Sequence, residues 1–155
     1  MPLPPFQRFL DEQRDPVWRF LVAAVGRDAA DDCFQETFLS ALQAYPRLRH
    51  GEHLRAWVLT IASRKAIDHH RARRRAAVPV GAPPEVATPA SEVADEETWR
   101  LVRELPARQR AVLLLRYAGD LPHRDVGAAL GCSEEASRQA AREGLRRLRD
   151  QIGAR

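Results

Sequence analysis

Six polar side chains between residues 133 and 142 are of the types that recognise DNA. Arginine and glutamine form paired hydrogen bonds with guanine and adenine edges, glutamate can accept from cytosine, and serine and arginine hold phosphate. Most of these side chains fall on the first turns of a predicted helix over 134–152. We therefore expect DNA contacts from Ser133, Glu135, Ser137, Arg138, Gln139 and Arg142.

The residues before this helix predict a helix-turn-helix unit. A helix over 122–130 carries Val126, Ala129 and Leu130 at helical spacing, Gly131 ends it, and Ser133 can cap the next helix. Two short helices joined by a turn that contains glycine are typical of this unit, whose second helix enters the DNA major groove. Taken alone, the pattern also fits a helical hairpin with a solvated arginine-rich face, in which Glu135 only caps the helix.

Positive charge gathers in two stretches of the chain. The formal net charge is +4, Lys65 is the only lysine, and arginines cluster over 64–75 and 138–149. Two separate basic clusters on a short chain indicate two contacts with a polyanion such as DNA. The alternative for 64–75 is a frayed helix end, since cations are favoured at a helix C-terminus.

The elements that must position these residues are helices. Apolar residues recur at helical spacing, and no alternation of period two predicts a strand. We expect one domain over 1–76, with helices over 5–25, 28–44 and 54–75, and a second over 95–155, with helices over 96–105, 106–117, 122–130 and 134–152. Residues 77–94 are rich in proline and predict a flexible linker. The buried stripe of the second helix is predicted to comprise Phe34, Phe38 and Leu42.

Several classes of function are disfavoured. No glycine-rich phosphate loop, metal-ligand spacing or nucleophile–base pair is found, so we expect no enzyme, no cofactor and no metal site. Cys33 and Cys132 are far apart in the chain and are predicted to be isolated thiols. No apolar run is long enough to span a membrane and no signal peptide is recognisable, so we expect a cytoplasmic protein without membrane insertion.

Three segments together resemble a known family. Residues 31–42 read DDCFQETFLSAL, residues 54–68 read LRAWVLTIASRKAID, and residues 105–117 read LPARQRAVLLLRY. In this order, and followed by the helix-turn-helix pattern, they resemble regions 2 and 4 of sigma-70 family RNA polymerase sigma factors, especially the extracytoplasmic-function (ECF) group. The chain departs from the family at Arg64, where asparagine is usual, and over 135–140, where EASRQA replaces a common GTVKSR.

The resemblance implies a subunit that binds core RNA polymerase and recognises the −10 and −35 promoter elements. Core polymerase would bind through its beta-prime clamp and its beta flap, and an anti-sigma factor is a further possible partner. The clamp would contact Asp32, Gln35, Glu36 and Leu39. The residues by themselves equally fit an acidic first helical turn on a solvated face.

The same resemblance assigns the −10 element to the loop before the third helix and to that helix, and the −35 element to the helix over 134–152. Opening the duplex takes a base out of its stack, and a pocket with a cationic track can offset that cost. Trp57 lies on the apolar stripe, so we expect it in the core rather than on a base. The expected −10 contacts are Arg49, His50, His53, Arg55, Arg64, Lys65, His69 and Arg71.

Two other functions remain open. A stand-alone helix-turn-helix regulator would bind specific DNA tightly without polymerase. A polymerase-binding scaffold without DNA contact would tolerate neutralisation of Arg138 and Arg142 together.

Overall fold

The structure is a computed structural model that describes residues 2–76 and 90–154, without the side chains of 90–95. The described residues are helical and contain no strand, which confirms the all-α prediction. Most of the predicted linker falls outside the described residues. The helices are α1 (Phe6–Val25), α2 (Arg27–Ala44), η1 (Tyr45–Arg47), α3 (Leu54–Arg75), α4 (Ala90–Arg103), α5 (Ala107–Leu113), the π-helical turn η2 (Leu114–Ala118), α6 (His123–Leu130) and α7 (Glu134–Gly153).

The first helix of the second half starts earlier than the sequence predicts. Helix α4 begins at Ala90 rather than at residue 96, so residues 90–94 belong to a helix and not to the linker. No glycine or proline interrupts the chain between 90 and 105, and therefore nothing in this stretch breaks a helix.

Helices α1, α2 and α3 pack into a three-helix bundle. Each buries an apolar face against the other two, and Phe9, Phe20 and Leu59 are almost fully buried. The rings of Phe9 and Trp57 lie 5.8 Å apart, so Trp57 belongs to an aromatic cluster in the core, as predicted.

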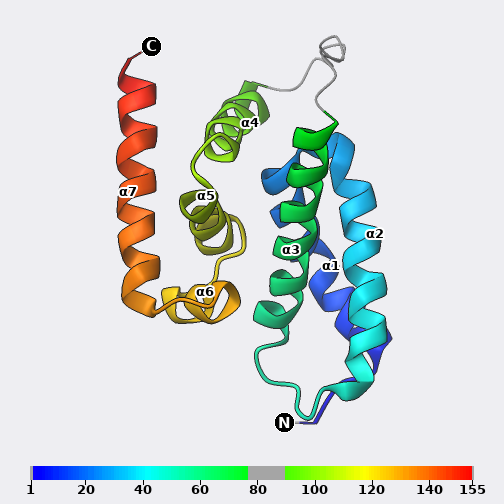
Figure 1. Cartoon of the computed structure of the whole chain (residues 1–155). Helices are drawn as coiled ribbons and strands as arrows, with labels where there is room; N and C mark the ends of the chain where they lie inside the picture. Colours follow the sequence, from blue (N-terminus) through cyan, green and yellow to red (C-terminus); the bar gives the residue numbers. More distant parts are fainter. Residues whose placement is uncertain (1, 77–89, 155) are drawn as a thin grey trace.

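The second half places the helix-turn-helix unit on one side of the molecule. Helices α5, α6 and α7 pack together, and α7 lies farthest from α2 (Figure 1). Gly131 adopts the left-handed conformation after α6, with a φ of 71°. The Ser133 hydroxyl accepts a hydrogen bond from the amide of Ala136 over 3.0 Å and caps α7.

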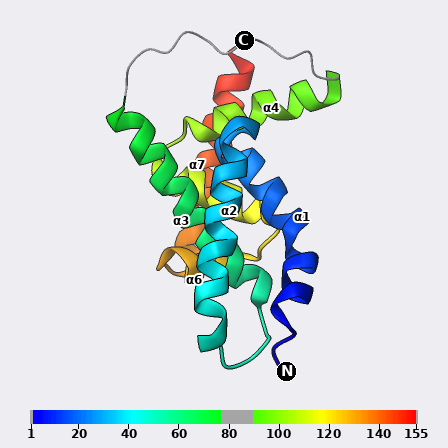
Figure 2. The ribbon, with the colours of Figure 1, turned by 90° about the vertical axis from the view of Figure 1, so that its right-hand side faces the viewer.

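The two halves pack against each other. Helix α1 contacts α4 and η2, and α3 contacts α6 (Figure 2). The buried apolar side chains of both halves form one continuous cluster, which includes Leu59 from α3 and Leu115 from η2. This arrangement was not expected from the sequence, which predicts only two modules on a tether. None of the helices within the described ranges is long and apolar enough to cross a membrane.

Candidate nucleic-acid and protein interfaces

Helix α7 presents five of the six predicted recognition residues to solvent. Ser133, Glu135, Arg138, Gln139 and Arg142 are exposed at the turn and along the first turns of α7. Their donors and acceptors are of the kinds that match base edges and phosphates in a major groove.

The sixth residue, Ser137, is fully buried. Its Oγ lies 2.8 Å from Nδ1 of His123, the first residue of α6, so this pair links the two helices of the unit. Burial and the charge of Arg116 lower the pKa of His123, which keeps its ring neutral at neutral pH. Ser137 therefore positions α7 in this structure and does not reach the surface that DNA would touch.

Two exposed arginines of α7, Arg138 and Arg142, form ion pairs with glutamates on the same helix. Arg138 pairs with Glu134 over 2.5 Å, and Arg142 donates to Glu135 over 3.2 Å and to Gln139 over 2.8 Å. These contacts orient the guanidinium groups along the helix and lower the net charge of its face. Phosphate groups must compete with the two glutamates for the arginines.

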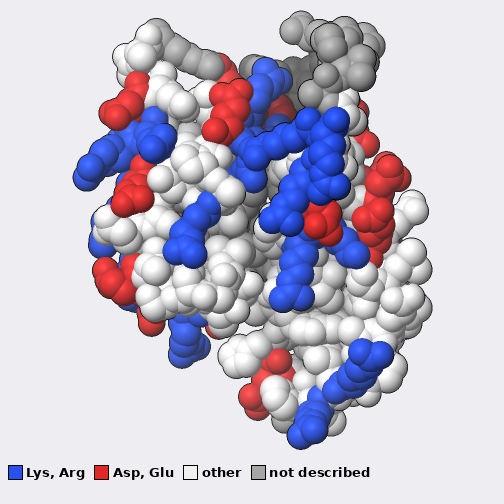
Figure 3. Space-filling view, in the orientation of Figure 1, with Lys and Arg blue, Asp and Glu red and all other residues white. Residues whose placement is uncertain are grey.

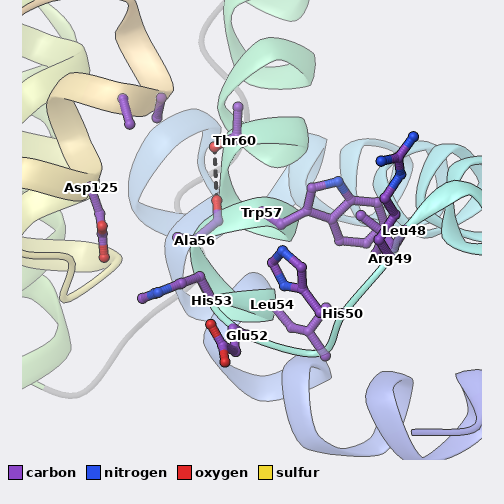
Figure 4. Close-up of a pocket in the computed structure, with 12 residues that line it drawn as sticks. Leu48, Arg49, His50, Glu52, His53, Leu54, Ala56, Trp57, Thr60 and Asp125 are labelled. Carbon is purple, nitrogen blue, oxygen red and sulfur yellow. Dashed lines mark hydrogen bonds between the residues drawn. The ribbon is translucent and has the colours of Figure 1, made fainter. Parts of the chain in front are cut away.

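The loop before α3 lines an open cavity of about 410 Å³. Its walls include Arg49, His50 and His53 from the loop, with Leu54 and Trp57 from the start of α3. Asp125 of α6 lines the same cavity, and Figure 4 shows it on the opposite side from His53 and Glu52. The cavity beside the predicted −10 loop therefore combines apolar side chains of α3 with three of the predicted contact residues, Arg49, His50 and His53. One of its walls comes from the second half of the chain.

The remaining predicted −10 residues follow α3 along its length. Arg55, Arg64 and Arg71 are exposed, whereas Lys65 is half-buried. Arg55 also donates from Nε to Gln13 Oε1 at 3.5 Å, which ties the start of α3 to α1. Arg64 and Arg71 are seven positions apart and share one exposed face of α3, which suits a nucleic-acid backbone, whereas the spacing of nine residues puts Arg55 on the opposite face.

His69 and His70 are both half-buried and point in different directions. His70 donates from Nε2 to the carbonyl of Ala24 over 2.8 Å, at the end of α1. Nε2 of His69 is buried and has no hydrogen-bond partner among the described residues. Burial lowers the pKa of both rings, and nearby arginines add to the effect. His69 is therefore uncharged at neutral pH and differs from the cationic residues predicted with it.

The predicted clamp-binding residues form one exposed face of α2. Asp32, Gln35, Glu36 and Leu39 are all exposed, and 60% of Leu39 is accessible to solvent. Leu42 was predicted in the buried stripe, but it is 50% exposed and lies three positions after Leu39. Phe38 is buried as predicted, but the buried face of α2 continues through Cys33, Thr37 and Ala41, so Leu42 lies outside it.

Both cysteines are free, as predicted. Cys33 is buried within α2, and burial together with Glu36 and Asp32 raises its pKa to about 11. Its thiol is protonated at neutral pH and is not a nucleophile. Among the described side chains, which cover 2–76 and 96–154, no three acidic, histidine or cysteine side chains gather closely enough to hold a metal ion.

Two family models match the chain. The model described as Sigma-70 region 2 matches residues 9–76, and the model described as Sigma-70, region 4 matches residues 95–148. The chain is 34% identical over 160 residues to the ECF RNA polymerase sigma factor SigD of Mycobacterium tuberculosis, covering 94% of this chain and 76% of SigD. It is 33% identical over 132 residues to the ECF RNA polymerase sigma factor SigC of the same species, covering 81% of this chain and 71% of SigC.

Two solved structures share the fold. The sigma factor RpoE in complex with the anti-sigma factor NepR, from Bartonella quintana, superposes with a TM-score of 0.79 at 21% identity, covering 96% of each chain. CnrH in complex with the cytosolic domain of CnrY gives a TM-score of 0.75 at 18% identity, covering 96% of this chain and 88% of CnrH.

Proposed function

This chain belongs to the sigma-70 family, in its ECF group, and on that premise we propose that it binds core RNA polymerase, recognises −35 and −10 promoter elements and helps to open the DNA. Sigma factors regulate transcription initiation and are not enzymes. We further propose that residues 1–76 and 95–155 act as separate binding modules, with the segment that joins them shortened to 77–89 by the start of α4 at Ala90.

The exposed face of α2 is the proposed contact with the polymerase clamp. Leu39 and Leu42 expose apolar surface beside the carboxylates of Asp32 and Glu36. An apolar pair rimmed by charge is the arrangement found at the centres of protein interfaces. The second half would bind the beta flap.

The loop over 48–54 and α3 form the proposed −10 site. The cavity beside Leu54 and Trp57 offers an apolar surface for an unstacked base, and Arg64 and Arg71, on one face of α3, would follow the displaced strand. Arg55 would contact the DNA separately, at the start of α3. Because Asp125 of α6 forms part of the same cavity, a DNA backbone would meet a carboxylate there. We therefore propose that the two halves move apart when the promoter binds.

Helix α7 is the proposed −35 reader. Arg138, Gln139 and Arg142 stand exposed on its first turns after a capped, glycine-containing turn, and this observation carries the promoter-binding proposal. The RpoE structure holds a sigma factor together with the anti-sigma factor NepR, so we also propose that an anti-sigma factor is a partner of this chain.

The decisive experiment is run-off transcription with purified core polymerase and a promoter library. We expect the chain to raise the amount of transcript above that made by core polymerase alone. The double variant Arg138→Gln/Arg142→Gln should lose this increase. Arg14→Gln, which changes an exposed arginine of α1, should keep it. Tight specific DNA binding without polymerase would instead identify a stand-alone regulator. Full activity of the double variant would identify a scaffold that does not touch DNA.

A further inference from the structure

A second cavity, of about 350 Å³, lies where the end of α3 faces α4 and α5. Figure 3 shows Lys and Arg side chains gathered over the upper part of α3 and toward α4. The cavity is lined by Arg73 and Arg74 from α3 and by Arg100, Arg103 and Arg110 from the second half, with His70 and Glu104. Five arginines thus share one small cavity with a single carboxylate. We call it the arginine groove.

Arg110 is the least exposed of these arginines, with 6% of its surface accessible. Its Nη1 donates to the carbonyl of Arg103 over 3.2 Å, which uses one of five N–H donors. None of the carboxylates whose positions the structure describes forms an ion pair with it. Burial and the neighbouring charge of Arg74 lower the pKa of Arg110. A buried cation without a counter-ion is costly, and an anion bound beside it would remove that cost.

Among the side chains that the structure describes, the carboxylates near the groove leave most of its charge uncompensated. Glu96 pairs with Arg103: its Oε1 lies 2.9 Å from Nη1 and its Oε2 lies 3.4 Å from Nη2. Glu104 is exposed at the rim. His70 adds no charge at neutral pH, because burial and the charges of Arg110 and Arg103 lower its pKa by more than the hydrogen bond to the Ala24 carbonyl raises it.

We propose that the arginine groove binds a small soluble anion that carries two or more phosphate groups, such as the diphosphate moiety of a nucleotide. Guanidinium groups bind phosphate through paired, charge-assisted hydrogen bonds, and several converging arginines suit more than one phosphate. A duplex backbone fits less well, because it is too bulky to enter the groove as far as Arg110, of whose surface only 6% is exposed. The groove takes walls from both halves, so the bound anion holds them together.

The test is calorimetric titration of the full chain with inorganic pyrophosphate, with sulfate at matched ionic strength as the reference anion. We expect pyrophosphate to bind at least about ten-fold more tightly than sulfate, and Arg110→Gln to weaken it about ten-fold. Since Arg110→Gln can affect folding, the double variant Arg73→Gln/Arg74→Gln changes two exposed lining residues and should cause a similar loss. Arg147→Gln, on the exposed face of α7 and outside the groove, is the matched control and should bind normally.

Four results would overturn the proposal. Pyrophosphate could bind no better than sulfate, or Arg147→Gln could lose as much affinity as the groove variants. Pyrophosphate could also bind only to the double variant Glu92→Gln/Asp95→Asn. The chain's own acidic segment would then be the counter-ion of the groove arginines. In a parallel titration, groove variants that weaken the binding of duplex DNA but not of pyrophosphate would assign these arginines to DNA contact instead.

Discussion

The guanidinium of Arg103 lies against the end of α1, with its Nε donating to the carbonyl of Ala23 over 2.9 Å. Its Nη2 donates to the carbonyl of Val22 over 2.9 Å, while its Nη1 pairs with Glu96. The last carbonyls of a helix lack partners within the helix and favour a cation nearby. A side chain of the second half therefore caps the first helix of the first half.

Replacing Arg103 should loosen the contact between the halves. Arg103→Gln removes the donors to both carbonyls, and we expect the free energy of unfolding to fall by about 2 kcal/mol, since hydrogen bonds from a charged group are worth more than neutral ones. Urea denaturation measures this loss, and small-angle X-ray scattering should show a larger radius of gyration. Arg108→Gln, an exposed arginine of α5, is the control. Unchanged stability and radius in Arg103→Gln would contradict this role.

The stability of the free chain should decrease as the pH falls below the ordinary histidine range. Burial lowers the pKa of His70 from its usual 6.5, so the unfolded chain binds more protons than the folded chain just below that pH. Stability is then fully present above 6.5 and is lost as the pH falls toward the lower folded value. Denaturation curves between about pH 7.5 and about pH 5.5 measure the loss.

His70→Gln should flatten this pH dependence, because an amide can still donate to the Ala24 carbonyl but does not titrate. His50→Gln, in the exposed loop before α3, should leave the slope unchanged. Equal slopes in the parent chain and in His70→Gln would show that His70 is not responsible.

The exposed leucines of α2 should matter for polymerase binding and not for folding. Leu39→Gln removes apolar surface that is 60% exposed, and we expect affinity for core polymerase to fall by about ten-fold or more, as for a residue at the centre of an interface. Ile152→Gln makes the same kind of change at a side chain that is 54% exposed on α7, and it should keep full affinity. Fluorescence anisotropy with labelled chain gives both values. Equal affinities would place the clamp contact elsewhere.

Arg142 and Glu135 should have opposite effects on DNA binding because they pair with each other over 3.2 Å. Arg142→Gln should weaken duplex binding and reduce the slope of log K against log salt by about 1, as for one lost phosphate contact. Glu135→Gln should tighten binding, since it frees Arg142 and removes a negative charge near phosphates. Anisotropy titrations at several salt concentrations measure both, with Arg14→Gln as control. Shifts in the same direction would argue against the competition.

The packing of the helix-turn-helix unit should depend on Gly127. A Cβ at this position would lie 2.6 Å from the carbonyl oxygen of Cys132, which is backbone and cannot move aside cheaply. We expect Gly127→Ala to destabilise the fold by about 1–3 kcal/mol, the usual cost of overpacking, and to weaken −35 binding. Gly153→Ala meets nothing within 4 Å and should be neutral or stabilising. Thermal denaturation distinguishes them, and similar melting temperatures would contradict the clash.

Local patterns predicted the helices well, because each helix depends on residues within a few turns of one another. The predicted 54–75 helix has the bounds of α3, and Ser133 caps α7 as its position suggests. Leu42 was misplaced because a helical stripe is broad, and only contact with α1 and α3 decides which edge of α2 is buried. The side chain of Ser137 was expected at the surface for a similar reason, since its burial depends on His123 in another helix.

By itself the sequence determined an all-helical chain, the helix-turn-helix turn and the positions of the two basic stretches, since these follow from spacing along the chain. The tertiary structure alone decided that the halves share one core, that α6 forms a wall of the cavity beside the −10 loop, and that five arginines meet in one groove. Arg103 and Ala23 are 80 positions apart, and no periodicity within a helix reports a contact between residues so distant.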